Sequence, residues 1–154
     1  MAFCDWSSDV CSSDLAASRD ALAKRFIGAI ATRDTAALRG MLLSRAEFAW
    51  LMFPDHRYAE PPYELDPGIF WLQITAENSK GVERVLQRYG GRPLTFEQLT
   101  CGVDTLQMLR GPTTIWGPCR VRYRTADSTI TRQLFGSMIE RNGRVKLVSY
   151  NNEF

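Results

Sequence analysis

The only histidine of the sequence, His56, limits the acid–base chemistry available to the chain. Ser-His-Asp and Cys-His arrangements need an imidazole base, and His56 is the one residue that could provide it. It follows Asp55 in a proline-flanked stretch, a context typical of an exposed turn. The sequence has no CxxC pair, no HExxH motif and no glycine-rich loop after a strand, so we expect no metal and no cofactor.

Carboxylates are the other candidates for acid–base chemistry. An isomerase-type proton shuttle needs a carboxyl group whose pKa is raised by an apolar site, with a Tyr or a protonated acid that stabilises the enolate oxygen. The acids nearest apolar residues are Glu47, Glu64, Asp66 and Asp104. None is marked by its spacing, and Asp66 is better explained as a helix cap. The sequence therefore assigns no catalytic residue.

Aromatic residues are densest between residues 48 and 71, where they could form either core or the wall of a ligand pocket. Core packing is the common outcome, although Tyr and Trp also offer a polar group inside an apolar cavity. The cluster consists of Phe48, Trp50, Phe53, Tyr58, Tyr63, Phe70 and Trp71. The candidates for binding a small apolar ligand are Trp50, Tyr58, Tyr63 and Trp71, together with Tyr123 from a later strand.

Three arginines, Arg120, Arg122 and Arg124, alternate along one predicted strand, so their side chains should project from one face of a sheet. The hairpin registers described below place Phe135 and Tyr150 on the same face. Such a face could be solvated, form a homodimer interface, bind a small anionic ligand or bind nucleic acid. The sequence has 19 Lys and Arg against 17 Asp and Glu, and this small excess argues against nucleic acid.

Two cysteines in the second half of the chain could form a disulfide. Cys101 ends one predicted strand and Cys119 begins another, which could bring their Cα atoms within the roughly 4.4 to 6.8 Å that a disulfide allows. A disulfide here would indicate an oxidising compartment and therefore export. The alternative is two buried thiols in a reducing compartment.

Capping residues followed by apolar residues at spacings of three and four predict helices that position these groups. The predicted helices begin after Ser18, after Asp34 or Thr35, and after Asp66. The last runs to the Gly90-Gly91 stop with an expected interruption near residues 79–81. The stretch SRAEFAWLMFP contains a capping box of Ser44 and Glu47 but is rich in β-favouring aromatics, so it predicts either a helix or a strand.

After Gly91 the apolar periodicity changes to two, which predicts antiparallel strands. The predicted strands are LTFEQLTC, the weaker VDTLQML, CRVRYRT, STITRQLFGSMIE and RVKLVSYNN. Two-residue turns at Ala126-Asp127 and Asn142-Gly143 set the registers. They place Tyr123 opposite Ile130, Met138 opposite Leu147 and Phe135 opposite Tyr150.

Residues 5–15 read DWSSDVCSSDL, which is the translation of a common sequencing-adapter DNA, and Cys4 fits the same frame. We therefore interpret residues 1–15 as a non-native segment that makes few native contacts, and residues 16–154 as a single domain. Residues 16–154 contain 19 cationic side chains against 14 carboxylates, a formal charge of +5. The sequence lacks the roughly 20 consecutive apolar residues that a membrane span requires.

Helices followed by an antiparallel meander predict an α+β fold, with N-terminal helices packed on a curved, cone-like sheet of four to five strands. This order of elements, with the closing stretch FGSMIERNGRVKLVSYNNEF, resembles the nuclear transport factor 2-like superfamily, which includes ketosteroid isomerase-like and polyketide cyclase-like groups. The resemblance implies a pocket between the helices and the sheet. A departure is the Pro-rich segment FPDHRYAEPPYELDPG, where that superfamily usually has a hairpin.

Three functions follow from these patterns as alternatives. We favour a domain that binds a small apolar or anionic ligand without catalysis. The first alternative is an isomerase or cyclase that uses a buried carboxylate, and the second is a structural module that forms a homodimer through its sheet. A buried acid in the space between the long helix and the sheet would favour the enzyme.

Overall fold

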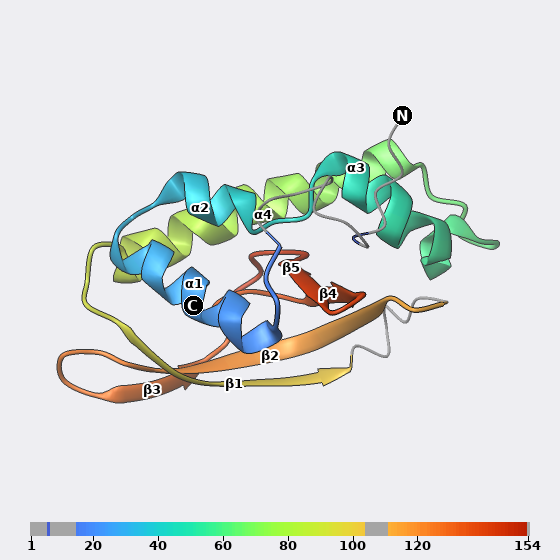
Figure 1. Ribbon diagram of the computed structural model, residues 1–154. Helices are drawn as coiled ribbons and strands as arrows, with labels where there is room; N and C mark the ends of the chain where they lie inside the picture. The colour runs from blue at the N-terminus through green and yellow to red at the C-terminus, as the bar shows by residue number, and fades with distance from the viewer. Residues whose placement is uncertain (1–5, 7–14, 104–110, 154) are drawn as a thin grey trace.

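Helices precede an antiparallel sheet along the chain, which confirms the predicted α+β class (Figure 1). The structure is a computed structural model, and it describes Trp6, residues 15–103 and residues 111–153. Over these residues it has four α-helices and five strands. The sheet is curved and the helices lie together on one side of the picture, above its long strands.

Each α-helix begins where the sequence places a cap. The helices are α1 (Arg19–Ala31), α2 (Thr35–Gly40), α3 (Arg45–Glu47) and α4 (Pro67–Tyr89). The side chains of Ser18, Asp34 and Asp66 accept hydrogen bonds from backbone N–H groups of the first turn, and Ser44 and Glu47 form the predicted capping box. The predicted interruption of α4 near residues 79–81 is wrong, because the helix runs through them.

The segment after α3 is helical, so of the helix and the strand that its sequence allowed, the helix is the one that forms. A π-helix (Phe48–Met52) is followed by short 3-10 helices (Phe53–Asp55 and Arg57–Ala59). His56 lies between the 3-10 helices, and its Nδ1 accepts a hydrogen bond of 3.1 Å from the Tyr58 N–H. Its ring packs on Tyr58 and Phe70 and is buried. The predicted exposed turn is therefore wrong, because these helical turns fold the segment back onto α4.

The strands are β1 (Thr95–Val103), β2 (Thr114–Arg124), β3 (Thr129–Arg132), β4 (Met138–Arg141) and β5 (Arg144–Leu147). Their order in the sheet is β1-β2-β4-β5, and β3 also pairs with β2. The registers of Tyr123 with Ile130 and of Met138 with Leu147 confirm both predicted turns. On the outer side of β5, Ala16 pairs with Val145 and Leu42 with Leu147. The weaker strand predicted over residues 103–109 lies outside the described residues apart from Val103.

The stretch predicted as one strand over residues 128–140 is two strands, β3 and β4. Both pair with β2, but β3 pairs with Val121–Arg124 and β4 with residues 114–116, so the ladder is interrupted opposite Pro118. Proline has no N–H to donate to a neighbouring strand. Residues 133–137 leave the alternating pattern there, and Leu134 and Phe135 are both buried.

Two apolar cores lie on opposite faces of β4. Met138 faces the first, with Phe26 of α1, Val121 of β2 and Leu86 of α4. Its neighbour Ile139 faces the second, with Phe48 and Phe70. Trp6 belongs to the second core and is 1% exposed, so the expectation that residues 1–15 make few contacts is wrong for this residue.

None of the described helices combines the length and the apolar character that crossing a bilayer requires.

Candidate functional site

A cavity of about 710 Å³ lies between α2, the start of α3 and α4, and residues from β5 and the segment after it also line it. This volume is within the range of roughly 300 to 1,000 Å³ that is typical of small-molecule sites. Its lining consists of Thr35, Leu38, Arg39, Gly40, Leu42, Leu43, Ser44, Glu47, Trp71, Thr75, Asn78, Ser79, Val82, Lys146 and Tyr150. The five residues from α4 recur at helical spacing, so one face of the long helix forms a wall.

A buried ion pair lies in this lining. Glu47 is 1% exposed and Lys146 is 4% exposed, and Lys146 Nζ donates to Glu47 Oε1 at 2.8 Å. The Ser44 N–H donates to the same oxygen at 2.9 Å, and Trp6 Nε1 donates to Glu47 Oε2 at 2.6 Å. Both oxygens of this carboxylate therefore have hydrogen-bond donors, as a buried charge requires.

The environment of Glu47 keeps it ionised. Burial raises its pKa, but the hydrogen bonds from Lys146 and Ser44 and the charge of Lys146 outweigh burial and hold the pKa below its ordinary value. A proton shuttle of the isomerase type needs a carboxyl group whose pKa is raised instead. Glu47 is thus a buried carboxylate, as such an enzyme would need, but its surroundings lower its pKa where the proton shuttle needs a raised one.

Asn78 presents a hydrogen-bond donor to the cavity. The Tyr150 N–H donates to Asn78 Oδ1 at 2.9 Å, which fixes the orientation of the amide because a backbone N–H can pair only with the oxygen. Within residues 15–103 and 111–153 no acceptor pairs with Nδ2. Asn78 itself is buried and lines the cavity.

Arg39 supplies a second positive charge to the lining. Its side chain is exposed, and no carboxylate of the described residues forms an ion pair with it. Among the described residues, the charged groups of the lining are Arg39, Lys146 and Glu47, so the cations exceed the carboxylates by one.

Of the five aromatic residues predicted to bind a ligand, the structure brings only Trp71 to the cavity. Trp50 is 46% exposed on the surface, and Tyr58 and Tyr63 pack on each other with ring centroids 5.2 Å apart. Tyr123 is buried in the first core, where its Oη donates to Tyr89 Oη at 2.6 Å. Burial raises the pKa of Tyr123, which is typical of a core tyrosine.

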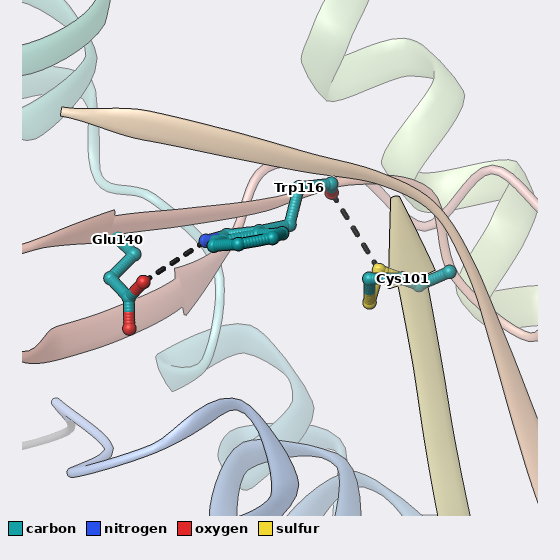
Figure 2. Close-up of a disulfide and its surroundings, with 4 residues drawn as sticks. Cys101, Trp116 and Glu140 are labelled. Atoms are coloured by element: carbon teal, nitrogen blue, oxygen red, sulfur yellow. Dashed lines mark hydrogen bonds between the residues drawn. A yellow bond between two sulfur atoms is a disulfide. The ribbon is translucent and has the colours of Figure 1, made fainter. Parts of the chain in front are cut away.

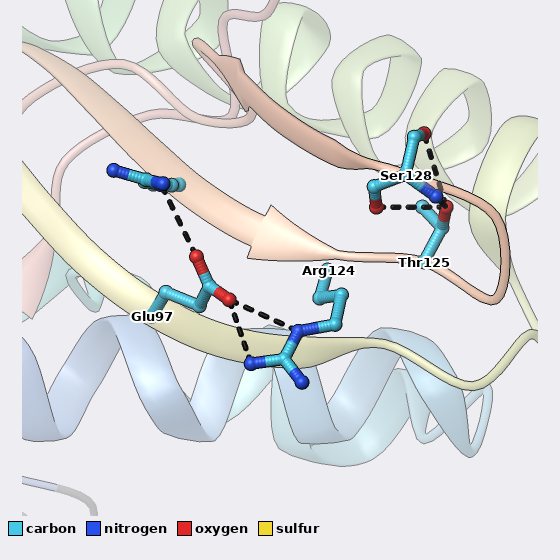
Figure 3. A network of polar contacts seen from close by, with 5 residues as sticks. Glu97, Arg124, Thr125 and Ser128 are labelled. Atoms are coloured by element: carbon cyan, nitrogen blue, oxygen red, sulfur yellow. Dashed lines mark hydrogen bonds and ion pairs between the residues drawn. The ribbon is translucent and has the colours of Figure 1, made fainter.

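The three arginines do share an exposed face of β2, but their partners are carboxylates. Figure 3 shows Arg124 with its partner Glu97. Glu97 pairs with Arg122 at 3.1 Å and with Arg124 at 2.8 Å, and Glu153 pairs with Arg120 at 2.9 Å. A register shift of β1 between Phe96 and Gln98 occurs at Glu97 and allows this side chain to reach the arginine face.

The prediction that Phe135 and Tyr150 lie on the arginine face is wrong. Both are fully buried around Phe26 of α1, at ring-centroid distances of 5.0 Å and 5.6 Å. The interruption between β3 and β4 changes the alternation, so the registers near the turns cannot be extended to these residues. The arginine face therefore lacks the aromatic pair on which its predicted dimer or nucleic-acid contact depended.

A disulfide joins Cys101 and Cys119, as one of the two predicted alternatives requires. The two residues are directly opposite in the β1–β2 ladder, with their Cα atoms 4.3 Å apart. Figure 2 shows the neighbouring Trp116, whose Nε1 donates to Glu140 Oε1 at 3.0 Å. The guanidinium of Arg19 lies 3.8 Å from the centroid of the Trp116 ring. The disulfide thus joins β1 to β2, and close to it the contact of Arg19 with Trp116 joins α1 to the sheet.

A second cavity, of about 430 Å³, lies between α4 and the sheet, where the family resemblance implies a pocket. Phe70, Ile74 and Glu77 of α4 line it together with Pro118 and Val148. Glu77 is exposed to solvent, so it is not the buried acid that a proton shuttle needs. Asp104 lies outside the described residues. In the part of the chain that the structure describes, no three metal-ligating side chains gather.

Sequence reasoning missed Asn78 and Lys146. Lys146 stands between Val145 and Leu147, and the period of two predicts that a lysine there faces solvent. It is buried because β5 is covered on both faces, and its partner Glu47 is 99 residues away in the chain. Asn78 stands in a helix without any local signal. The hydrogen bond to Tyr150 that defines its role joins residues separated by 72 positions.

Comparisons with protein-family models, with curated proteins and with solved structures found no match. The likeness to the nuclear transport factor 2-like superfamily therefore stays a resemblance in the order of elements. The function has to be argued from the geometry of the cavity.

Proposed function

We propose that this domain binds a small amphiphilic molecule in the cavity between α2 and α4 and carries out no chemistry on it. The observation that carries the proposal is a cavity of about 710 Å³ in which Glu47, the acidic residue among the described lining residues, is already paired on both oxygens. A site of this kind offers binding surface and fixed polar contacts, but it offers no free acid or base.

The wall of the cavity supports an apolar ligand body. Leu38, Leu42 and Leu43 line it from α2 and the link to α3, and Trp71 and Val82 line it from α4. A ligand that removes this surface from water gains roughly 25 cal/mol for each Å² of apolar area buried. Ligand pockets with an apolar wall and a few fixed polar groups are the common type in proteins.

The enzyme alternative has less support. A cavity that performs acid–base catalysis needs a titratable group whose pKa is near the working pH. Glu47 has a lowered pKa, and the other titratable residues in the described part of the lining are Arg39, Lys146 and Tyr150. The Oη of Tyr150 donates to the Leu38 carbonyl oxygen, and burial raises the pKa of the phenol, so it is not available as a base.

The test uses 1-octanol, an uncharged probe with an apolar body, in isothermal titration calorimetry on the full chain. Ser79→Trp places a large ring on the lining, whereas Lys80→Trp places the same ring on the next residue of α4, which is exposed and does not line the cavity. We expect Ser79→Trp to weaken octanol binding at least about tenfold and Lys80→Trp to leave it within about twofold.

Thermal melts of both variants check that they are folded. The proposal is wrong if octanol and its carboxylate analogue octanoate both fail to bind the wild-type chain. It is also wrong if the two tryptophan variants bind the probes as the wild type does.

A further inference from the structure

We infer that the ligand of this cavity is an organic monocarboxylate, held by its carboxylate between Lys146, Asn78 and Arg39. This inference rests on the proposed function, because it names the chemical class of the molecule that the cavity binds. It uses three groups on three different elements: Arg39 on α2, Asn78 on α4 and Lys146 on β5.

Asn78 is the most specific of the three. Its Oδ1 is occupied by the Tyr150 N–H, so the group that remains for a ligand is the Nδ2 amine, which only donates. Asn78 is 7% exposed, and Nδ2 is not among the fully buried atoms without a partner, so this N–H group stays accessible. A ligand acceptor placed in the cavity would satisfy it.

Lys146, like Asn78, offers hydrogen-bond donors to a ligand, and it also carries a positive charge. An ammonium group has three N–H bonds, and among the described residues one acceptor, Glu47 Oε1, pairs with Lys146 Nζ. The ion pair also fixes the position of Nζ in the lining, so little side-chain freedom is lost when a second acceptor binds. Glu47 therefore acts as a positioning residue for Lys146.

The charges of the lining favour one negative charge on the ligand. In the described part of the lining Arg39 and Lys146 are cations and Glu47 is an anion, so a monoanion brings these groups to neutrality. A dicarboxylate would leave a net negative charge and would place its second carboxylate against the apolar wall, where an unpaired charge is costly. A cationic ligand would find no free carboxylate among the described lining residues, since Glu47 is paired on both oxygens.

The first experiment compares head groups on one apolar body. Calorimetry of the wild-type chain with octanoate, 1-octanol and octanedioate should give octanoate as the tightest ligand, at least about tenfold over 1-octanol. Equal affinity for octanoate and 1-octanol would overturn the inference and leave the proposed function standing. Tighter binding of octanedioate would overturn the assignment of a single carboxylate. Failure of all three probes would overturn the proposed function as well.

The second experiment reverses the polarity of Asn78. Asn78→Asp keeps an oxygen acceptor for the Tyr150 N–H but replaces the amide NH2 group with a second oxygen. We expect octanoate binding to weaken at least about tenfold while 1-octanol binding changes less than about twofold. Unchanged octanoate binding in a folded Asn78→Asp chain would overturn the inference.

The third experiment uses a matched pair of arginines. Arg39→Gln and Arg45→Gln each remove one exposed positive charge near the start of α3, but only Arg39 lines the cavity. Octanoate binding should weaken in Arg39→Gln and stay near the wild-type value in Arg45→Gln, and added salt should reduce the difference. Equal effects of the two substitutions would show a general charge effect and overturn the role of Arg39.

Discussion

Glu47 shows how one residue can serve both local structure and a distant site. As the third residue of α3 it completes a capping box with Ser44, and with the same carboxylate it accepts hydrogen bonds from Trp6 and Lys146. A buried ion pair adds little net stability compared with apolar residues of similar volume, but removing one partner leaves the other charge unpaired. The spacing of Ser44 and Glu47 predicts the cap. No feature of the sequence predicts that Glu47 also pairs with Lys146.

The stability of the fold should depend on the ionisation of Glu47 at acid pH. The pKa of Glu47 is lowered in the folded state, so its contribution is fully present above the unfolded value of about 4.3 and is lost as the pH falls through the folded value. At pH 7 Glu47→Gln should cost about 3 to 5 kcal/mol because Lys146 loses its counter-charge. Urea unfolding from pH 7 to pH 3 should show the difference between the two chains shrinking below about pH 4.3. A constant difference across that range would contradict this account.

The contact between α4 and the segment after β5 requires a glycine. A Cβ on Gly81 would collide with the carbonyl of Tyr150, and the Gly81 carbonyl oxygen accepts a hydrogen bond of 2.8 Å from Asn152 Nδ2. Three residues earlier in the same helix, Asn78 accepts from the Tyr150 N–H. This approach brings Tyr150 against the cavity lining, so the packing of two elements sets the geometry of the site.

Two glycine substitutions should have opposite effects. In a helix, Gly→Ala usually stabilises by about 1 kcal/mol, and Gly28→Ala should do so because no atom lies within 4 Å of the new Cβ. Gly81→Ala should instead destabilise by about 1 to 3 kcal/mol, because α4 must move away from Tyr150. Urea unfolding of both variants measures whether each substitution raises or lowers the free energy of unfolding. Stabilisation by Gly81→Ala would mean that the elements are not in close contact.

The elements that the sequence predicted correctly depend on local signals. Helix caps and tight turns act over a few residues. The structure has the caps at Ser18, Asp34 and Asp66 and the turn at Asn142-Gly143 at the predicted positions. The interruption between β3 and β4 was missed because it depends on Pro118, which lies on a different strand. The alternation of inward and outward side chains does not continue from β3 through residues 133–137, so a prediction that continues it places Phe135 on the wrong face.

The candidate site was much less predictable, because its residues come together only in the complete fold. Trp71 was named from the aromatic cluster, and Glu47 from its apolar neighbours. Tyr150 was named for the arginine face, and it lines the cavity instead. Lys146 and Asn78 depend on which faces of β5 and α4 are covered, and a single sequence does not specify that.

On the scale of the whole molecule, the two cores on opposite faces of β4 hold distant parts of the chain together. Trp6 packs in the second core with Leu43, Phe48 and Ile139, and it also donates to Glu47. Trp6 is thereby connected with the ion pair in the cavity lining. This residue therefore helps to hold the site in place.

Two tryptophan substitutions should separate this role from a surface position. Trp6→Ala should destabilise the fold by about 3 to 5 kcal/mol, the usual cost of truncating a buried Trp, since its ring is 1% exposed. Trp50→Ala, at a residue 46% exposed, should cost no more than about 1 kcal/mol. Equal losses in thermal or urea unfolding would refute the buried placement of Trp6.

The short pairings on the outer side of β5 have a consequence for the behaviour of the protein at high concentration. Ala16 and Val145 exchange two backbone hydrogen bonds, of 3.2 Å and 3.0 Å, and Leu147 is bonded to Met41 and Leu43 at 2.8 Å and 2.9 Å. An unpaired edge strand can recruit a strand from another molecule, which is a common start of aggregation. At this edge the chain supplies its own partners. The β5 border of the sheet is therefore protected against growth by strand addition.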